Sequence, residues 1–327
     1  MGRVLVGDVG GTRSRFAVAH RGDAGIVLEA FRTFPNASYT AFAEVLSAYL
    51  SQAPLSQDFG PVPPRALFAL AGPPLADGSV TLTNRDWPTI RPGDLEQAMG
   101  IPAVSLVNDF AAMARAVPEM AADAFETVLD GRGVGDAPVL VTGPGTGFGV
   151  STLVPTAGGG WRVLTGEGGH AGFAARTQRE AEIAERLFAE HGFVSTEAVV
   201  SGGWLPRVLD VVSDLHGQAR RDLAAGDVLA QAEAGDPVCA EVCALRARAI
   251  MGAAGDAALI TGAQGGVVLT GGVAEHMGAW LRTSEAVERF RARGKRSDWI
   301  AEVPVRILHA AEAPLIGAAA LAFELGD

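Results

Sequence analysis

Apolar runs of strand length alternate along this chain with segments of helical period. The runs predict strands in a hairpin at 4–19 and at 26–32, 66–72, 80–84, 103–107, 138–142, 148–154, 161–164, 267–272 and 305–308. The periodic segments predict helices at 40–51, 92–99, from 110 onward, several between 177 and 262 with the longest at 237–260, others near 276–292, and one at 314–324. Strands that alternate with helices in this way indicate an α/β fold.

The opening segment, VLVGDVGGTRSRFAVA at 4–19, carries the most chemical information. Two apolar strands flank a turn that contains Asp8, Gly10, Gly11 and Thr12. Glycines let backbone N–H groups approach an anion, the threonine hydroxyl adds a donor, and the carboxylate can face a metal ion or its waters. Taken alone, the segment also fits an ordinary glycine hairpin, and that alternative stays open here.

The same order of features recurs in VLVTGPGTGFGVSTLV at 139–154, where an apolar strand, a glycine-rich turn with threonine and a second strand follow one another. A third turn, Gly271-Gly272, ends a strand and precedes a helix. Phosphates and nucleotides bind at such turns in α/β proteins. We therefore expect a duplicated α/β unit whose glycine turns face one cleft.

Composition narrows the class of protein. The 327 residues favour two domains, and a formal charge of −11 argues against nucleic acid or an anionic membrane as a partner. We find neither a signal-peptide pattern nor an uninterrupted apolar run that could span a bilayer. Cys239 and Cys243, four residues apart, make a poor metal site and are expected to be buried reduced thiols, which suits a cytoplasmic protein.

Two common nucleotide-binding motifs are excluded. A Walker A loop reads Gly-x-x-x-x-Gly-Lys-Ser/Thr, whereas the only lysine, Lys295, is followed by Arg296 and lacks the first glycine six residues upstream. The run at 143–149 lacks the Gly-x-Gly-x-x-Gly spacing of a dinucleotide-binding fold and opens a strand. With both motifs excluded, the remaining possibility is a fold that holds phosphates between two hairpin turns.

Five motifs, in order and over nearly the whole chain, resemble the bacterial glucokinases of the hexokinase–actin–chaperone ATPase superfamily. They are DVGGT at 8–12, LVNDFAAMA at 106–114, GPGTGFGV at 143–150, EGGH at 167–170 and LTGGVAEH at 269–276. The resemblance implies a two-domain actin-like ATPase fold, a duplicated ribonuclease H-like fold with a central cleft. It implies a small domain of residues 1–110 plus 312–327, a large domain of 111–311, and a homodimer.

The same resemblance implies phosphorylation of glucose to glucose 6-phosphate by ATP with Mg²⁺, the two domains closing on both substrates. Asp109 would be the base for the 6-hydroxyl, and Asp8 would face Mg²⁺ through water. The sugar would be held by Asn84, Asn108, Asp109, Glu167, His170 and Glu197. ATP would be held by Asp8, Gly10, Gly11, Thr12, Arg13, Gly143, Gly145, Thr146, Gly271 and Gly272.

Several of these residues also have simpler roles. Asp109 stands where a strand meets a helix, so it can be an N-cap, which is the commoner role for aspartate there. Glu197 at a helix start can serve the helix dipole, and His170 can be a structural hydrogen-bonding residue. Arg13, which stands where the family usually has asparagine, can contact phosphate or pair with a surface acid.

Other departures from the family pattern are Gly172 in place of aspartate and Ala198 in place of arginine. They adjoin the expected sugar-facing turns, so they bear on specificity more than on chemistry. A kinase of another hexose, or a sugar-responsive regulator without catalysis, is therefore the alternative function. An acyl-phosphate kinase or phosphatase of the same superfamily would not need the sugar-binding set. The cysteine-rich zinc motif of repressor-related sugar kinases is absent.

Overall fold

The computed structural model describes residues 2–52 and 63–326. The chain forms two compact units, Met1–Ala121 with Ala310–Asp327, and Ala122–His309. The sequence predicts slightly different domain bounds, 1–110 with 312–327 and 111–311, and these remain a prediction. Each unit is described by itself below.

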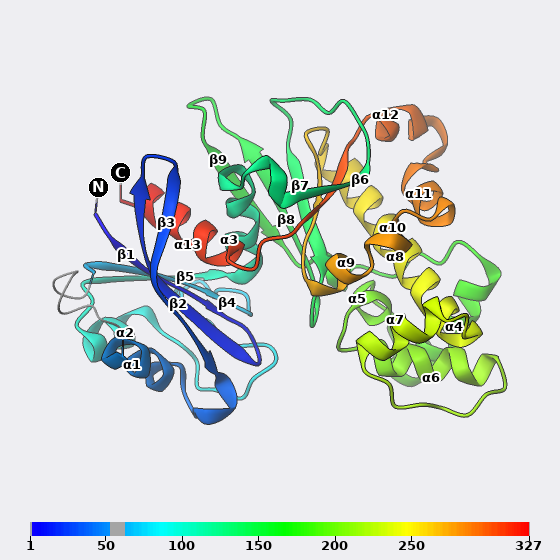
Figure 1. The fold of residues 1–327 in the computed structure, drawn as a ribbon, viewed down its shortest axis with the longest axis horizontal. Helices are drawn as coiled ribbons and strands as arrows, with labels where there is room; N and C mark the ends of the chain where they lie inside the picture. Colours follow the sequence, from blue (N-terminus) through cyan, green and yellow to red (C-terminus); the bar gives the residue numbers. More distant parts are fainter. Residues whose placement is uncertain (1, 53–62, 327) are drawn as a thin grey trace. The chain divides into compact units, whose positions relative to one another are not determined.

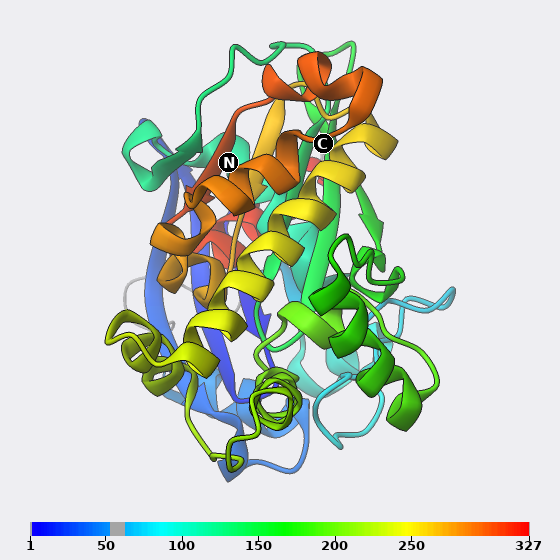
Figure 2. The ribbon, with the colours of Figure 1, turned by 90° about the vertical axis from the view of Figure 1, so that its right-hand side faces the viewer.

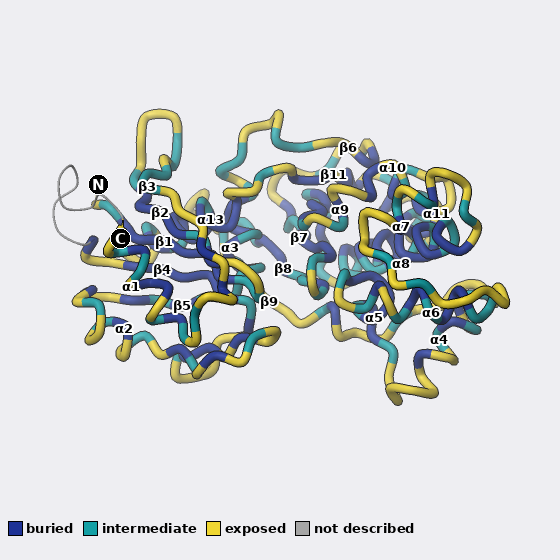
Figure 3. The backbone as a smooth tube through the Cα atoms, turned by 60° about the horizontal axis from the view of Figure 1, so that its bottom comes forward, coloured by how far each residue is buried: buried dark blue, intermediate teal, exposed yellow. Residues whose placement is uncertain are grey.

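The first unit is built on a five-stranded mixed sheet in the order β3-β2-β1-β4-β5. Its strands are β1 (Val4–Val9), β2 (Arg13–Gly22), β3 (Gly25–Pro35), β4 (Arg65–Leu70) and β5 (Ala103–Asn108). β1 runs antiparallel to β2 and parallel to β4, and β4 runs parallel to β5. Every residue of β1 is buried, which explains why apolar residues occupy both of its faces and leaves Asp8 as its one charged side chain; Figure 3 shows β1 and β4 mostly in dark blue.

Alternate strand residues of this sheet face two different cores. Figure 1 shows α1 (Phe42–Gln52) and α13 (Ala313–Glu324) on opposite sides of the sheet. On one face, Phe16 and Phe68 pack against aromatic side chains of α1. On the other face, alanines of α13 pack against the small and branched residues of β1, β2 and β4. The helices of this unit are α1 (Phe42–Gln52), α2 (Pro92–Met99), α3 (Asp109–Ala116) and α13 (Ala313–Glu324), with short 3₁₀ turns η1 (Asn36–Ser38) and η2 (Val117–Glu119).

The second unit repeats this topology with one strand added. Its sheet has the order β6-β11-β10-β7-β8-β9. From β9 to β11 the pairings are antiparallel, antiparallel, parallel and parallel, the same series as from β3 to β5 in the first sheet. The strands are β6 (Phe125–Leu129), β7 (Val139–Pro144), β8 (Phe148–Pro155), β9 (Trp161–Gly166), β10 (Gly266–Leu269) and β11 (Val305–Leu308). The duplicated α/β unit expected from the two glycine hairpins is confirmed.

Helix α8 is the longest helix of this unit and passes through its core. Asp236 caps its start by accepting a hydrogen bond from the N–H of Cys239, and Gly262 in the left-handed conformation ends it. Figure 2 shows α8 in yellow with α11 in orange beside it. The helices are α4 (Gln178–His191), α5 (Glu197–Val200), α6 (Leu205–Leu215), α7 (Ala225–Glu233), α8 (Pro237–Thr261), α9 (Gly272–His276), α10 (Gly278–Leu281), α11 (Ser284–Arg291) and α12 (Ser297–Ala301), with 3₁₀ turns η3 (Ala122–Ala124), η4 (Gly168–His170) and η5 (Gly294–Arg296).

Two secondary-structure predictions differ from the structure. The strand expected at 80–84 is absent: Val80 makes only isolated bridges to Pro74 and Ile90, because no continuous strand runs beside it. Strand β6 was not expected, because five residues at the edge of a sheet carry little periodicity. Among the described residues, no helix combines the length and the apolar character needed to cross a bilayer.

The two cysteines lead to a first prediction. Both thiols lie in the core on α8, and burial raises the pKa of each to about 11. Since the thiolate is the reactive form, neither cysteine should react with Ellman's reagent at pH 8 in the folded protein, and both should react in guanidinium chloride. Absorbance of the released thionitrobenzoate measures this, and labelling of one thiol per native chain within minutes would contradict it.

Candidate functional site

Asp8 is held at the end of β1 by an ion pair with the next strand. The β1–β2 register places Asp8 opposite Arg15, whose Nη2 lies 2.9 Å from the Asp8 Oδ2. Burial raises the pKa of Asp8, and the Arg15 guanidinium opposes this shift without cancelling it. Arg15 also donates to the carbonyl of Ala311, 2.5 Å away, so it joins the hairpin to the segment before α13.

The Gly10–Thr12 turn is closed by a hydrogen bond from the N–H of Gly10 to the carbonyl of Arg13, at 3.0 Å. The side chains of Thr12 and Arg13 are exposed. The Arg13 guanidinium has no hydrogen-bond or ion-pair partner among the described residues, so the structure does not pair it with a surface acid. Asn84 is also exposed and lies against this turn, since a Cβ built on Gly11 would be 3.4 Å from the Asn84 Cβ.

Asn108 and Asp109 lie where β5 passes into α3. The N-cap of α3 is Asn108, whose Oδ1 accepts from the N–H of Phe110 at 2.9 Å, while its Nδ2 donates to the carbonyl of Gly72 at 3.4 Å. Asp109 is the first residue of the helix and is half-buried. The N-cap role that the sequence allowed for Asp109 therefore belongs to its neighbour.

Asp8 and Asp109 lie at the same end of the first sheet, where the parallel strands have their carboxyl ends. Asp8 pairs with Ala69 and Asn108 with Leu70, so β1 and β5 end at the same level on either side of β4. Two strand spacings correspond to about 10 Å. The carboxyl ends of parallel strands are the usual binding edge of an α/β sheet.

In the second unit, three glycine turns pack against one another. The N–H groups of Gly202 and Gly203 donate to the carbonyls of Gly145 and Thr146, at 2.8 and 3.1 Å. A Cβ on Gly143 would lie 1.9 Å from the Thr270 carbonyl oxygen, so only glycine fits there. The turn of Gly271 and Gly272 packs against the turn that begins at Gly143, since a Cβ on Gly271 would lie 2.8 Å from the Pro144 carbonyl oxygen. The predicted residues Gly143, Gly145, Thr146, Gly271 and Gly272 are thus neighbours.

The predicted residues Glu167, His170 and Glu197 lie around one residue of β8, Phe148. Oε2 of Glu197 accepts from the N–H of Phe148 at 2.8 Å. On the other side, a Cβ on Gly169 would lie 2.1 Å from the Phe148 carbonyl oxygen, which explains a glycine between Glu167 and His170. The side chains of Glu167 and His170 are mostly exposed, with Oε2 and Nε2 4.0 Å apart.

Each unit therefore brings its own predicted residues together. The first holds Asp8, the turn at 10–13, Asn84, Asn108 and Asp109, and the second holds the others. That both sets line one cleft stays a prediction, because each unit is described by itself. Arg15 was missed by sequence reasoning, although its strand position opposite Asp8 was a usable signal.

The comparisons with known proteins agree with these motifs. The family model described as Glucokinase matches residues 5–325. The chain belongs to the glucokinase family. A glucokinase of Chromobacterium violaceum is 35% identical over 97% of this chain and 88% of its own length. A glucokinase of Aromatoleum aromaticum is 36% identical over 98% of this chain and 96% of its own length. The activity of this family member is the ATP-dependent phosphorylation of glucose.

Solved structures agree in fold. The structure of a glucokinase from an Antarctic psychrotroph matches with a TM-score of 0.85 and 35% identity, covering 99% of each chain. A glucokinase from Balamuthia mandrillaris, solved in complex with glucose, matches with a TM-score of 0.80 at 20% identity, covering 98% of this chain and 94% of the other. The two-domain actin-like ATPase fold expected from the motifs is confirmed.

Proposed function

We propose that this glucokinase transfers the terminal phosphoryl group of ATP to the 6-hydroxyl of glucose, with Asp109 as the base. The observation that carries the proposal is the carboxyl end of the parallel strands of the first sheet, where Asp8 lies near the end of β1 and Asp109 directly follows β5, with β4 between the two strands. A carboxylate there can take the proton of the attacking hydroxyl while the phosphate-binding turn at 10–12 holds the donor. Asp109 lies in the first turn of α3, where the positive end of the helix dipole interacts favourably with a carboxylate.

Sugar binding is assigned to side chains that can exchange hydrogen bonds with hydroxyl groups. These are the carboxylates, the amides and the imidazole of Asn84, Asn108, Asp109, Glu167, His170 and Glu197. The exposure of Glu167 and His170 leaves their polar atoms accessible to a ligand. Glu197 has one oxygen committed to Phe148, so it would orient the turn at 145–147 as well as contact sugar.

The ATP phosphates are assigned to the glycine turns of both units. In the first, these are Asp8, Gly10, Gly11, Thr12 and the Arg13 guanidinium, whose charge offsets part of the formal −11 of the chain. In the second unit, the phosphates would be bound by Gly143, Gly145 and Thr146. The nucleoside would be bound by Gly271 and Gly272.

The residues around Asp8 fit a Mg²⁺ ion that arrives with ATP. Asp8 has one oxygen paired with Arg15, and no cluster of three or more acidic, histidine or cysteine side chains occurs in the part of the chain that the structure describes. Mg²⁺ bound to phosphates keeps several waters and needs only one or two carboxylates. Bound there, the ion would neutralise phosphate charge, with Asp8 accepting hydrogen bonds from its waters.

We also propose that the enzyme is a cytoplasmic homodimer. The support is the family resemblance for the dimer, and for the location the two thiols held without a disulfide. Size-exclusion chromatography with light scattering tests the dimer by giving twice the 33.6 kDa mass of one chain.

A coupled ADP-release assay tests the proposed function. Glucose, mannose, fructose and N-acetylglucosamine are each offered with ATP and Mg²⁺, and glucose should give the highest kcat/KM. A higher value for another sugar would make the chain a kinase of that hexose. Release of ADP with none of them, in a protein that still binds glucose, would favour the sugar-responsive regulator.

A further inference from the structure

Asn36 is a buried amide on which the phosphate-binding turn of the first unit rests. It follows β3 as the first residue of η1, and its exposed fraction is 0%. Its Nδ2 donates to the carbonyl of Gly10 at 2.8 Å, and its backbone N–H donates to the carbonyl of Thr12 at 2.9 Å. One residue therefore holds both ends of the Gly10–Thr12 turn.

The Gly10 carbonyl, which can only accept, sets the orientation of that amide, and the hydroxyl of Ser14 satisfies its other end. The hydroxyl of Ser14 donates to the Asn36 Oδ1 at 2.7 Å, and both side chains are fully buried. With its oxygen taken by Ser14, the Asn36 amide presents its Nδ2 donor to Gly10. A buried donor and acceptor that have lost their partners are costly, so this arrangement is strongly preferred over a flipped amide.

The consequence for the turn follows from peptide geometry. In a trans peptide, C=O and N–H point in opposite directions. Because the carbonyl of Gly10 is directed at Asn36, the N–H of Gly11 in the same peptide is directed away from Asn36 and from the core around it. That N–H is one of the donors assigned to phosphate.

Asn36 also connects this turn to the segment of a candidate sugar residue. Arg85 donates to the carbonyl of Asn36 and, at 3.0 Å, to that of Tyr39, and its guanidinium stacks on Trp87 with 4.5 Å to the ring centroid. The residue before Arg85 is Asn84, which lies against Gly11.

We propose that Asn36 is a positioning residue for ATP: its amide sets the orientation of the Gly10–Gly11 peptide and so the affinity for the phosphates. The proposal rests on the phosphate-binding role assigned above to the Gly10–Thr12 turn. It assigns Asn36 no contact with either substrate.

The test variant is Asn36→Asp, which keeps the oxygen that accepts from Ser14 and replaces the donor that Gly10 needs by a second oxygen. The KM for ATP should rise on the order of tenfold, while the KM for glucose stays within about twofold, because a carboxylate cannot donate to the Gly10 carbonyl and the Gly10–Gly11 peptide loses its fixed orientation. Titration calorimetry with a non-hydrolysable ATP analogue should show the same loss of affinity as the KM.

Ser14→Ala gives a milder second test that does not add a buried charge. It leaves the buried Asn36 Oδ1 without its donor, which loosens the amide and should raise the KM for ATP by about threefold. Its matched control is Ser79→Ala, which removes another buried hydroxyl of the same unit, one that donates to Asp77 at 2.6 Å and not to the turn. The control should leave the KM for ATP unchanged.

An unchanged KM for ATP in both Ser14→Ala and folded Asn36→Asp would overturn the proposal. An equal rise of both KM values, or an equal effect of Ser14→Ala and Ser79→Ala, would also overturn it, since either result indicates general loosening. Failure of the proposed function is seen separately, as absence of glucose-dependent ADP release by the wild-type enzyme. Calorimetry with the ATP analogue would still decide the role of Asn36 in that case.

Discussion

Asp109→Asn is expected to lower kcat by a factor of roughly 10²–10⁴, the usual contribution of a general base. The amide has the shape of the carboxylate, so its oxygen can still accept from the N–H of Phe110, which lies 2.9 Å from the Asp109 Oδ1. It cannot take a proton from the 6-hydroxyl. Glucose binding, measured by calorimetry or protein fluorescence, should therefore stay within a few-fold of wild type while ADP release nearly stops.

The matched control is Asp94→Asn, which makes the same change at another acidic residue in the first turn of a helix of the same unit. Asp94 is exposed on α2 and should be replaceable without loss of kcat. If Asp109→Asn kept kcat within about tenfold, Asp109 would not be the base. If it lost glucose binding together with kcat, its role would be to hold the sugar.

Elements with strong local signals were predicted closely from the sequence. Helix α2 has exactly the expected bounds, because Pro92 starts it and Gly100, in the left-handed conformation, ends it. Strand β11 likewise has the expected bounds, 305–308, between Pro304 and His309. The paired glycine hairpins predicted the duplication, since β1–β2 and β7–β8 occupy corresponding places in two sheets with the same series of pairings.

The contacts that shape the candidate site could not be predicted from local sequence patterns. Asn36 is 26 residues from the glycine whose carbonyl it binds, and an asparagine after a strand is typical of any turn. Glu197 is 49 residues from Phe148 in the same way. These partners depend on the sheet being assembled, so hydrophobic periodicity carries no information about them.

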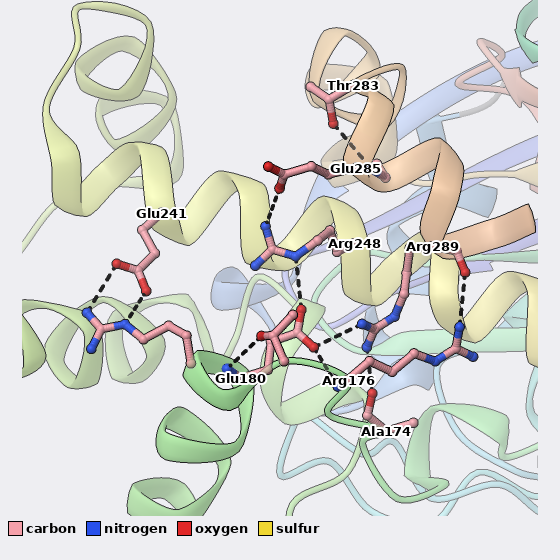
Figure 4. Close-up of polar contacts among 11 residues, drawn as sticks. Ala174, Arg176, Glu180, Glu241, Arg248, Thr283, Glu285 and Arg289 are labelled. Atoms are coloured by element: carbon pink, nitrogen blue, oxygen red, sulfur yellow. Dashed lines mark hydrogen bonds and ion pairs between the residues drawn. The ribbon is translucent and has the colours of Figure 1, made fainter. Parts of the chain in front are cut away.

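A buried ion network of the second unit shows the same dependence on tertiary structure. Glu180 of α4 is buried, and its carboxylate meets Arg248 of α8 at 2.9 Å and Arg289 of α11 at 3.0 Å (Figure 4). Its Oε2 also accepts from the N–H of Arg176 at 2.8 Å. Burial raises the pKa of Glu180, but these hydrogen bonds and charges outweigh it and the net pKa is lowered.

Glu180→Ala should lower the free energy of unfolding by about 3–5 kcal/mol, because it leaves two arginines in a buried site without their common counter-ion. Urea titration followed by circular dichroism measures the loss. Glu285→Ala is the matched control, since Glu285 binds the same Arg248 at 2.8 Å from an exposed position and should cost less than about 1 kcal/mol. Equal losses in the two variants would contradict the prediction.

The effect of Glu180 should also depend on pH in a defined direction. A carboxyl whose folded pKa lies below its ordinary value, near 4.5 for glutamate, binds protons less readily in the folded state. Its stabilising contribution is then fully present above pH 4.5 and is lost as the pH falls through the folded pKa. The difference in unfolding free energy between wild type and Glu180→Gln should therefore be constant from pH 6 to 8 and shrink below about pH 4. A difference that grew on acidification would mean that desolvation, and not the three arginines, governs this carboxylate.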